Sequence, residues 1–138
     1  AVAVGGGYNH RLNLSDGILI KDNHIIASSS VTKAIESVRK AGAGLPLEIE
    51  VDNTNQIREA LEANVDGFLL DNMNPQTIKE SVCLIRASEN GNDIFIEASG
   101  GITLKNIHPF LETGIDAISI GALTHQAVSK DIRLNFIT

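Results

Sequence analysis

Two groups of cationic side chains stand within residues 5–24, on either side of a short apolar run. His10 and Arg11 follow three consecutive glycines, and Lys21 comes directly after the apolar run. Arginine offers a planar fork of donors suited to a carboxylate, whereas lysine offers a compact point charge. If the run between the two groups forms a strand, both groups can reach one ligand. We therefore expect a pocket for a small ligand with several negative charges, such as a dicarboxylate or a phosphorylated sugar.

Two carboxylates, Glu50 and Asp71, stand at the ends of the next two apolar runs. In α/β barrels the working residues lie at the carboxyl ends of strands, so these two side chains can face one ligand. Paired carboxylates can hold Mg²⁺, contact ribose hydroxyls or stabilise a developing positive charge. The alternative is that each caps a helix or faces solvent, and Asp52 is the better candidate for helix capping. Glu48 shares a strand face with Glu50, so its role stays open.

Glycines follow the last two apolar runs, as Ser99-Gly100-Gly101 and as Gly121-Ala122. Glycine lets backbone N–H groups approach a phosphate closely, and a helix beginning after the first of these segments would add a favourable dipole. Loops after the last strands of α/β barrels frequently form a phosphate site. The alternative is two ordinary glycine turns, and their shared place after the last two strands favours the phosphate site.

The elements that must position these residues follow an alternating pattern. We expect strands at 17–20, 47–51, 67–70, 94–98 and 117–120, and helices at 31–41, 54–64, 75–89 and 104–113. The strands look apolar throughout, without alternation, as in a parallel sheet that is buried on both faces. The pattern predicts an α/β fold, an incomplete (β/α) TIM-like barrel with about five β-α units. Residues 1–4 look like a strand already under way, so we expect earlier strands upstream of Ala1.

Composition narrows the function further. The chain of 138 residues has a net charge of −6 and a pI of about 5.1, which argues against a nucleic-acid partner. Cys83 is the only cysteine, which excludes a disulfide within the chain. We expect it on the buried side of a helix, as part of the hydrophobic core. No apolar run approaches the length of a membrane span, and no signal peptide is visible. We expect no membrane partner and a cytoplasmic location.

The strand-end sequences, in their order, resemble those of quinolinate phosphoribosyltransferase, also called nicotinate-nucleotide pyrophosphorylase (carboxylating). The motifs that carry the resemblance are GGGYNHR (5–11), LIKDNH (19–24), LEIEVDN (47–53), GFLLDNM (67–73), IEASGGI (96–102) and ISIGALTH (118–125). The resemblance covers nearly the whole chain. It implies an α/β-barrel domain with fewer strands than a regular eight-fold barrel, and it implies a pentosyltransferase. The reaction converts quinolinate and phosphoribosyl pyrophosphate to nicotinate mononucleotide, pyrophosphate and CO₂, a step of de novo NAD synthesis.

The resemblance also assigns roles to the site residues. It implies that His10, Arg11 and Lys21 hold the quinolinate carboxylates, and that Glu50 and Asp71 face the ribose and the Mg²⁺-bound pyrophosphate. It counts Lys21, Glu50 and Asp71 as catalytic. The backbone of the glycine segments would hold the 5′-phosphate, at Ser99, Gly100, Gly101, Gly121 and Ala122. Three further residues would line the mouth of the same site and support it: Asp22, Asn23 and His24.

Parts of the family pattern lie outside this sequence. The family carries a Thr-Arg-Lys-Thr motif upstream of the first glycines, and an amino-terminal domain that supplies an Arg across a dimer interface. We therefore interpret residues 1–138 as the C-terminal part of the α/β-barrel catalytic domain, without the N-terminal domain and the first barrel strand or strands. We expect a homodimer or higher homo-oligomer, and weak or no activity of this segment alone. The alternative is a non-catalytic ligand-binding or oligomerisation module on the same barrel.

Overall fold

A computed structural model describes residues 1–11, 13–42 and 44–136. Five strands form one parallel sheet in chain order: β1 (Ile18–Ile20), β2 (Leu47–Val51), β3 (Gly67–Asp71), β4 (Phe95–Ser99) and β5 (Ala117–Ile118). Each strand pairs with the next one along the chain, as in an arc of a (β/α) barrel. The fold is thus α/β, an incomplete TIM-like barrel, as the sequence predicted.

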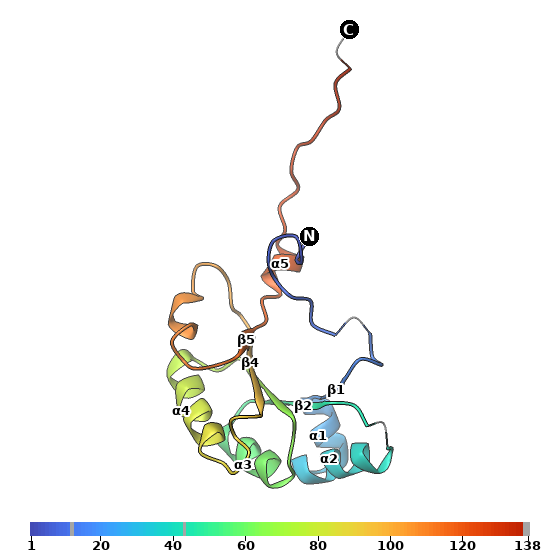
Figure 1. Cartoon of the computed structure of the whole chain (residues 1–138), viewed down its shortest axis with the longest axis vertical. Helices are drawn as coiled ribbons and strands as arrows, with labels where there is room; N and C mark the ends of the chain where they lie inside the picture. Colours follow the sequence, from blue (N-terminus) through green and yellow to red (C-terminus); the bar gives the residue numbers. More distant parts are fainter. Residues whose placement is uncertain (12, 43, 137–138) are drawn as a thin grey trace.

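The principal helices cover one face of this sheet. They are α1 (Asp22–Ser28), α2 (Val31–Lys40), α3 (Thr54–Glu62) and α4 (Pro75–Arg86), and each packs beside the next. A 3₁₀ turn, η1 (His108–Phe110), and a short helix, α5 (Ala122–His125), follow. Figure 1 shows the helices on one side of the strands and the C-terminal segment running away from the body.

The core lies between the sheet and the helices. Register brings Ile20, Ile49, Phe68 and Ile96 into one row across four strands, and none of these side chains is more than 2% exposed. Ile57 of α3 and Ile78 of α4 are fully buried against this layer. The apolar stripes of both helices therefore fix which sheet face is covered, and the opposite face is left for polar side chains.

The structure corrects three sequence-based expectations of secondary structure. Residues 1–4 form turns and not a strand, and residues 104–113 form turns around η1 and not an α-helix. The second difference matters because the glycines at 99–101 then lack a following α-helix with its dipole. The structure also adds α1, a helix that starts directly after β1 at Asp22.

Two expectations about single side chains are also wrong. Cys83 is exposed on α4, because Val82 and Ile85 take the positions that face the core. The N-cap of α3 is Asn53 and not Asp52, since the Asn53 side chain accepts hydrogen bonds from two backbone N–H groups of the first turn.

Within the described residues, no helix has both the length and the hydropathy that crossing a membrane requires.

Candidate active site

The second strand alternates between the two faces of the sheet, which corrects the expectation of uniformly apolar strands. Leu47, Ile49 and Val51 are buried toward the helices. Glu48 and Glu50 therefore project from the opposite face. The sequence LEIEV thus serves both purposes, because its period of two puts the aliphatic side chains in the core and both carboxylates on the inner face of the barrel arc.

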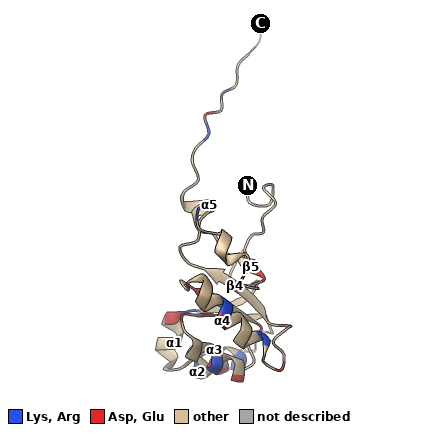
Figure 2. Ribbon diagram, turned by 90° about the vertical axis from the view of Figure 1, so that its left-hand side faces the viewer, with Lys and Arg blue, Asp and Glu red and all other residues tan. Residues whose placement is uncertain are grey.

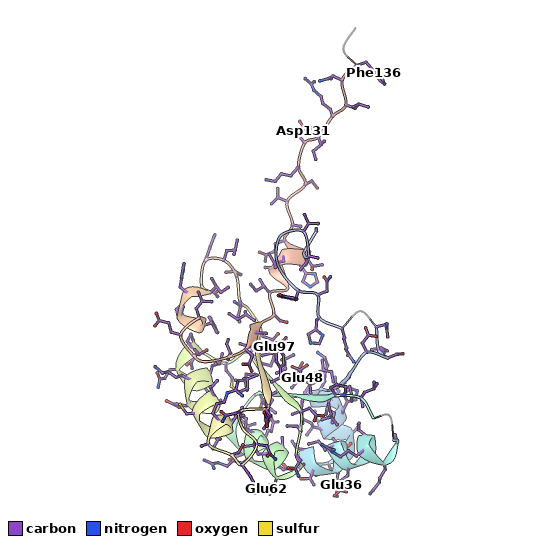
Figure 3. All side chains as sticks on the ribbon, in the orientation of Figure 1. Glu36, Glu48, Glu62, Glu97, Asp131 and Phe136 are labelled. Carbon is purple, nitrogen blue, oxygen red and sulfur yellow. The ribbon has the colours of Figure 1, made fainter. Side chains whose placement is uncertain are left out.

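Strand register brings further acidic groups onto the same face. Glu50 pairs with Leu69 of β3, and Leu69 pairs with Glu97 of β4. Asp71 lies two residues beyond Leu69 and pairs with Ser99, so it shares the face nearer the carboxyl ends of the strands. Figure 3 shows Glu48 and Glu97 close together at the sheet, whereas Glu36 and Glu62 lie on the helical side.

Lys21 and Glu50 form an ion pair at the carboxyl ends of β1 and β2. Lys21 Nζ lies 2.9 Å from Glu50 Oε2, and the lysine side chain remains half exposed. Lys21 is also the N-cap residue of α1, so the start of this helix fixes its backbone. The sequence predicted that the ends of these strands meet, and the structure joins them through this pair.

A small cavity of about 90 Å³ lies beside this ion pair. Its polar lining consists of oxygen-bearing side chains, contributed by Asp22, Glu50, Asp52, Gln56 and Asp71. Glu50 and Asp71 therefore face one space, as expected from the sequence. Hard divalent cations prefer oxygen ligands, and these side chains offer them, but among the described residues the ligand atoms that lie within 4.8 Å of one another are those of His10, Glu48 and Glu97.

His10 lies against two carboxylates of the inner face. Its Nε2 atom is 3.5 Å from Glu48 Oε2 and 3.7 Å from Glu97 Oε2. The Glu97 carboxylate is buried and accepts a hydrogen bond from the Ser119 hydroxyl. Burial raises the pKa of Glu48, and the neighbouring Glu97 carboxylate adds to this rise. The sequence had no role for Glu97, although its period-two position in β4 marks the same face as Ser99.

Arg11 lies near the amino end of β1, whereas Lys21 follows its carboxyl end. Its Nη1 donates to the Gly17 carbonyl at 3.0 Å, just before β1 begins. His10 and Arg11 line a cavity of about 240 Å³ that also contacts Gly67 and Phe95, the first residues of β3 and β4. The structure thus puts His10 and Lys21 on one face, but the cavity that His10 and Arg11 line does not include Lys21.

The residues after Lys21 form the first turn of α1. The His24 imidazole Nδ1 accepts the backbone N–H of Lys21 at 2.9 Å, and Asp22 Oδ1 accepts the backbone N–H of Asn23. His24 thus positions the backbone of Lys21. Asp22 is the member of this group that reaches the small cavity.

The loop after β4 interlocks with the residue after β3. The Asn72 backbone N–H donates to the Ser99 carbonyl at 2.9 Å, and the Asn72 side-chain Nδ2 donates to Asp71 Oδ2 at 2.7 Å. Gly100 has φ +93°, and Asn106 Nδ2 donates to the Gly101 carbonyl. Sequence reasoning missed Asn72, because its contacts depend on a left-handed backbone conformation that no local sequence motif predicts.

The second glycine segment lies at the start of α5. Gly121 is the N-cap residue of this four-residue helix, and Ala122 is its first residue. A Cβ at Gly121 would lie 3.4 Å from the His125 ring, which therefore packs on the segment. In Figure 2 the ribbon of α5 has no red residue, whereas both blue and red residues occur along the layer of α1–α4.

Comparison with known proteins identifies a family. The sequence model of the family described as "Quinolinate phosphoribosyl transferase, C-terminal domain" matches residues 1–135. A relative in Bacillus subtilis (strain 168), named "Probable nicotinate-nucleotide pyrophosphorylase (carboxylating)", is 44% identical over 98% of this chain and 45% of its own length. The protein of that name in Mycobacterium leprae (strain TN) is 42% identical over 98% of this chain and 47% of its own.

Solved structures agree with this assignment. NadC from Streptococcus pyogenes superimposes with a TM-score of 0.84 at 44% identity, over 94% of this chain and 44% of the other. The nicotinate-nucleotide pyrophosphorylase from Ehrlichia chaffeensis gives a TM-score of 0.81 at 41% identity, over 90% of this chain and 43% of the other. The chain thus spans about half the length of the proteins that it matches.

Proposed function

Because this chain belongs to the family of quinolinate phosphoribosyl transferase C-terminal domains, we propose that the protein catalyses phosphoribosyl transfer from phosphoribosyl pyrophosphate to quinolinate. The products are nicotinate mononucleotide, pyrophosphate and CO₂. The observation that carries this proposal is the Lys21–Glu50 ion pair beside the cavity that Asp71 also lines. The ion pair puts Lys21, a cation that can bind the anionic quinolinate ring, beside the carboxylates that can bind the ribose and its metal ion. The role is a step of de novo NAD synthesis.

Quinolinate carries two carboxylates, and we assign them to His10 and Lys21 of the inner face, and to Arg11 once its hydrogen bond to the Gly17 carbonyl, near the amino end of β1, is exchanged for the ligand. Two of these groups are held by protein carboxylates in the free chain: His10 by Glu48 and Glu97, and Lys21 by Glu50. These partners keep the cations oriented until an anionic ligand competes for them. A cationic group held in place loses less side-chain entropy when the substrate arrives.

Magnesium and the ribose belong to Glu50 and Asp71 in this proposal, with Mg²⁺ arriving together with phosphoribosyl pyrophosphate. The four carboxylates that line the small cavity support that assignment. When bound, the ion neutralises charge on the leaving pyrophosphate. The protein carboxylates face the ribose, where positive charge develops at the anomeric carbon, and stabilise it electrostatically.

The 5′-phosphate is assigned to backbone N–H groups of two segments, Ser99-Gly100-Gly101 and Gly121-Ala122. Both follow the last two strands of the arc, the usual place for a phosphate in such barrels. Asp22, Asn23 and His24 form a supporting shell, since His24 fixes the backbone of Lys21.

The chemistry requires positioning more than proton transfer. The pyridine nitrogen attacks the anomeric carbon as the bond from that carbon to pyrophosphate breaks, and the cations of the inner face orient the ring for this step. The new bond leaves a positive charge on the ring nitrogen. That charge stabilises the electron pair left on the adjacent ring carbon when the bond from this carbon to its carboxylate breaks and CO₂ leaves, and a proton from solvent then adds to the same carbon.

Assembly and location extend the proposal. Residues 1–138 serve as the C-terminal part of the barrel catalytic domain in a homodimer or higher homo-oligomer, in the cytoplasm. Support for assembly comes from apolar side chains that this chain leaves more than three-quarters exposed, among them Tyr8, Leu14 and Ile132.

Binding calorimetry with quinolinate, and separately with Mg²⁺ and phosphoribosyl pyrophosphate, tests the assignment of ligands. We expect both to bind to the wild-type protein. Binding of neither ligand by folded protein would contradict the proposal. Binding of both ligands, but no turnover even when this chain is joined to the part of the Bacillus subtilis relative that it does not match, would favour a ligand-binding module.

A further inference from the structure

Asn72 occupies a backbone conformation that asparagine adopts at an energetic cost. Its φ is +52°, in the left-handed region that favours glycine. Residues held in such conformations persist only where the surrounding structure enforces them. Asn72 comes directly after Asp71, at the carboxyl edge of the sheet. At position 72, the residue that gives the most stable backbone can therefore differ from the residue that the function requires.

Asn72 makes contacts with both neighbouring segments. Its side-chain Nδ2 donates to Asp71 Oδ2 at 2.7 Å, and its backbone N–H donates to the Ser99 carbonyl at 2.9 Å. The first bond orients the carboxylate that faces the small cavity. The second continues the β3–β4 ladder one residue past its end, into the glycine loop.

Gly100 is fitted against the same asparagine. A Cβ at Gly100 would lie 2.3 Å from Asn72 Oδ1 and 2.7 Å from the Asn72 backbone N, distances that real Cβ atoms do not show. Gly100 also has φ +93°. The asparagine side chain therefore packs on the glycine backbone, so Gly100 serves close approach as well as conformational freedom.

We propose that Asn72 is a positioning residue that ties the Asp71 carboxylate to the Ser99–Gly100 loop. The inference rests on the proposed function and deepens it. Phosphoribosyl pyrophosphate has its 5′-phosphate at one end and its pyrophosphate, with Mg²⁺, near the other. The contacts of Asn72 hold the Ser99–Gly100 loop, assigned to the 5′-phosphate, at a fixed distance from the Asp71 carboxylate, assigned to the ribose and Mg²⁺. Asn72 thereby acts through Asp71 and the loop, without a contact of its own to the reacting atoms.

Asn72→Gly separates this role from a merely structural one. Glycine takes the left-handed conformation without steric cost and keeps the backbone N–H, but it loses both contacts of the side chain. We expect an unchanged or higher urea midpoint, and at least tenfold weaker binding of Mg²⁺–phosphoribosyl pyrophosphate in calorimetry. Exchange at the loop is read at the residue-72 amide, which donates to the Ser99 carbonyl, and it should rise at least tenfold without ligand.

Asn64→Gly is the matched control. Asn64 has φ +56° and lies at the other end of the sheet, after α3. This variant should change the urea midpoint in the same direction, with ligand affinity and loop exchange within twofold of wild type. Affinity of Asn72→Gly within twofold of wild type would overturn the proposal, and so would unchanged loop exchange. Faster loop exchange in a protein whose wild type binds no phosphoribosyl pyrophosphate would support the tie and contradict the proposed function instead.

Discussion

Lys21 Nζ and Glu50 Oε2 lie 2.9 Å apart, and this ion pair joins the carboxyl ends of β1 and β2. The pair connects the two halves of the proposed site, because Lys21 is assigned to quinolinate and Glu50 to the ribose and Mg²⁺. Its half-exposed lysine and largely buried carboxylate mean that an incoming anion meets the cation first.

Replacing Lys21 with alanine should remove one substrate and spare the other. Charge-assisted hydrogen bonds contribute about 1.5–3 kcal/mol, so we expect quinolinate affinity to fall at least tenfold in calorimetry. Affinity for Mg²⁺–phosphoribosyl pyrophosphate should stay within about threefold, since Glu50 and Asp71 remain. The control is Lys40→Ala, which breaks the exposed Lys40–Glu36 pair on α2 and should change neither affinity. Equal losses for both ligands would argue against the assignment.

Glu97→Gln should weaken quinolinate binding through His10. The buried carboxylate of Glu97 lies 3.7 Å from His10 Nε2, and the amide keeps its shape without its charge. We expect a loss of about three- to tenfold, and no further loss when the same change is made in His10→Ala, because contacting residues are not additive. Glu112→Gln, on an exposed turn, serves as the control. Additive losses in the double variant would separate Glu97 from His10.

Glu59 should make stability depend on pH in the acid range. Hydrogen bonds from the Thr32 backbone N–H and hydroxyl, both 2.9 Å, hold the pKa of Glu59 below its ordinary value of 4.5. A lowered carboxyl pKa stabilises the fold above 4.5, and this contribution disappears as the pH falls through the folded-state pKa. Glu59→Gln should therefore lower the urea midpoint at pH 7 and lose this difference near pH 3. Glu62→Gln on the same helix should show no such pattern, and a difference that grows in acid would contradict the prediction.

Gly91→Ala should destabilise the loop between α4 and β4. A Cβ there would lie 2.1 Å from the Ile85 carbonyl oxygen and 2.8 Å from the Arg86 Cα, both backbone atoms that cannot move cheaply. Overpacking of this kind costs about 1–3 kcal/mol, which urea denaturation would measure. Gly17→Ala, with its nearest neighbour 3.8 Å from the added carbon, should change stability by less than about 0.5 kcal/mol. A stable Gly91→Ala protein would show that the loop packs differently.

The sequence predicted the arc of five strands well, because hydrophobic periodicity and strand spacing report the layer that each element must bury. The helix expected at 75–89 is α4, which begins at Pro75 as expected and ends earlier, at Arg86. Residues 104–113 were misassigned because Phe110 and Ile107 pack on the core while Leu104 and Leu111 stay exposed, so the segment has no buried helical stripe. The sequence put Glu48 and Glu50 on one strand face, but the strands were still expected to be apolar throughout, whereas LEIEV alternates between buried and partly exposed residues.

Site residues at strand ends were predictable from order alone, since parallel strands bring their carboxyl ends to one edge. Register is a tertiary property, so the approach of Glu97 to His10 could not be predicted from local sequence. The role of Asn72 was equally hidden, because both of its contacts depend on a left-handed φ and on the glycine of a neighbouring strand.

This chain alone should turn over slowly or not at all. It spans about half the length of its relatives, and its arc of five strands leaves both sheet edges unpaired in the described residues. A steady-state assay of the purified chain should give less than about one hundredth of the rate of a full-length relative. A comparable rate would show that the described residues contain the whole active site.

Release of labelled CO₂ from ring-carboxyl-labelled quinolinate, with phosphoribosyl pyrophosphate and Mg²⁺, tests the central claim most directly. The measurement uses this chain joined to the part of the Bacillus subtilis relative that it does not match, beside the same protein carrying Lys21→Ala. We predict release that requires both phosphoribosyl pyrophosphate and Mg²⁺ and that the Lys21→Ala change abolishes. No release from a folded protein that binds both substrates would contradict the account.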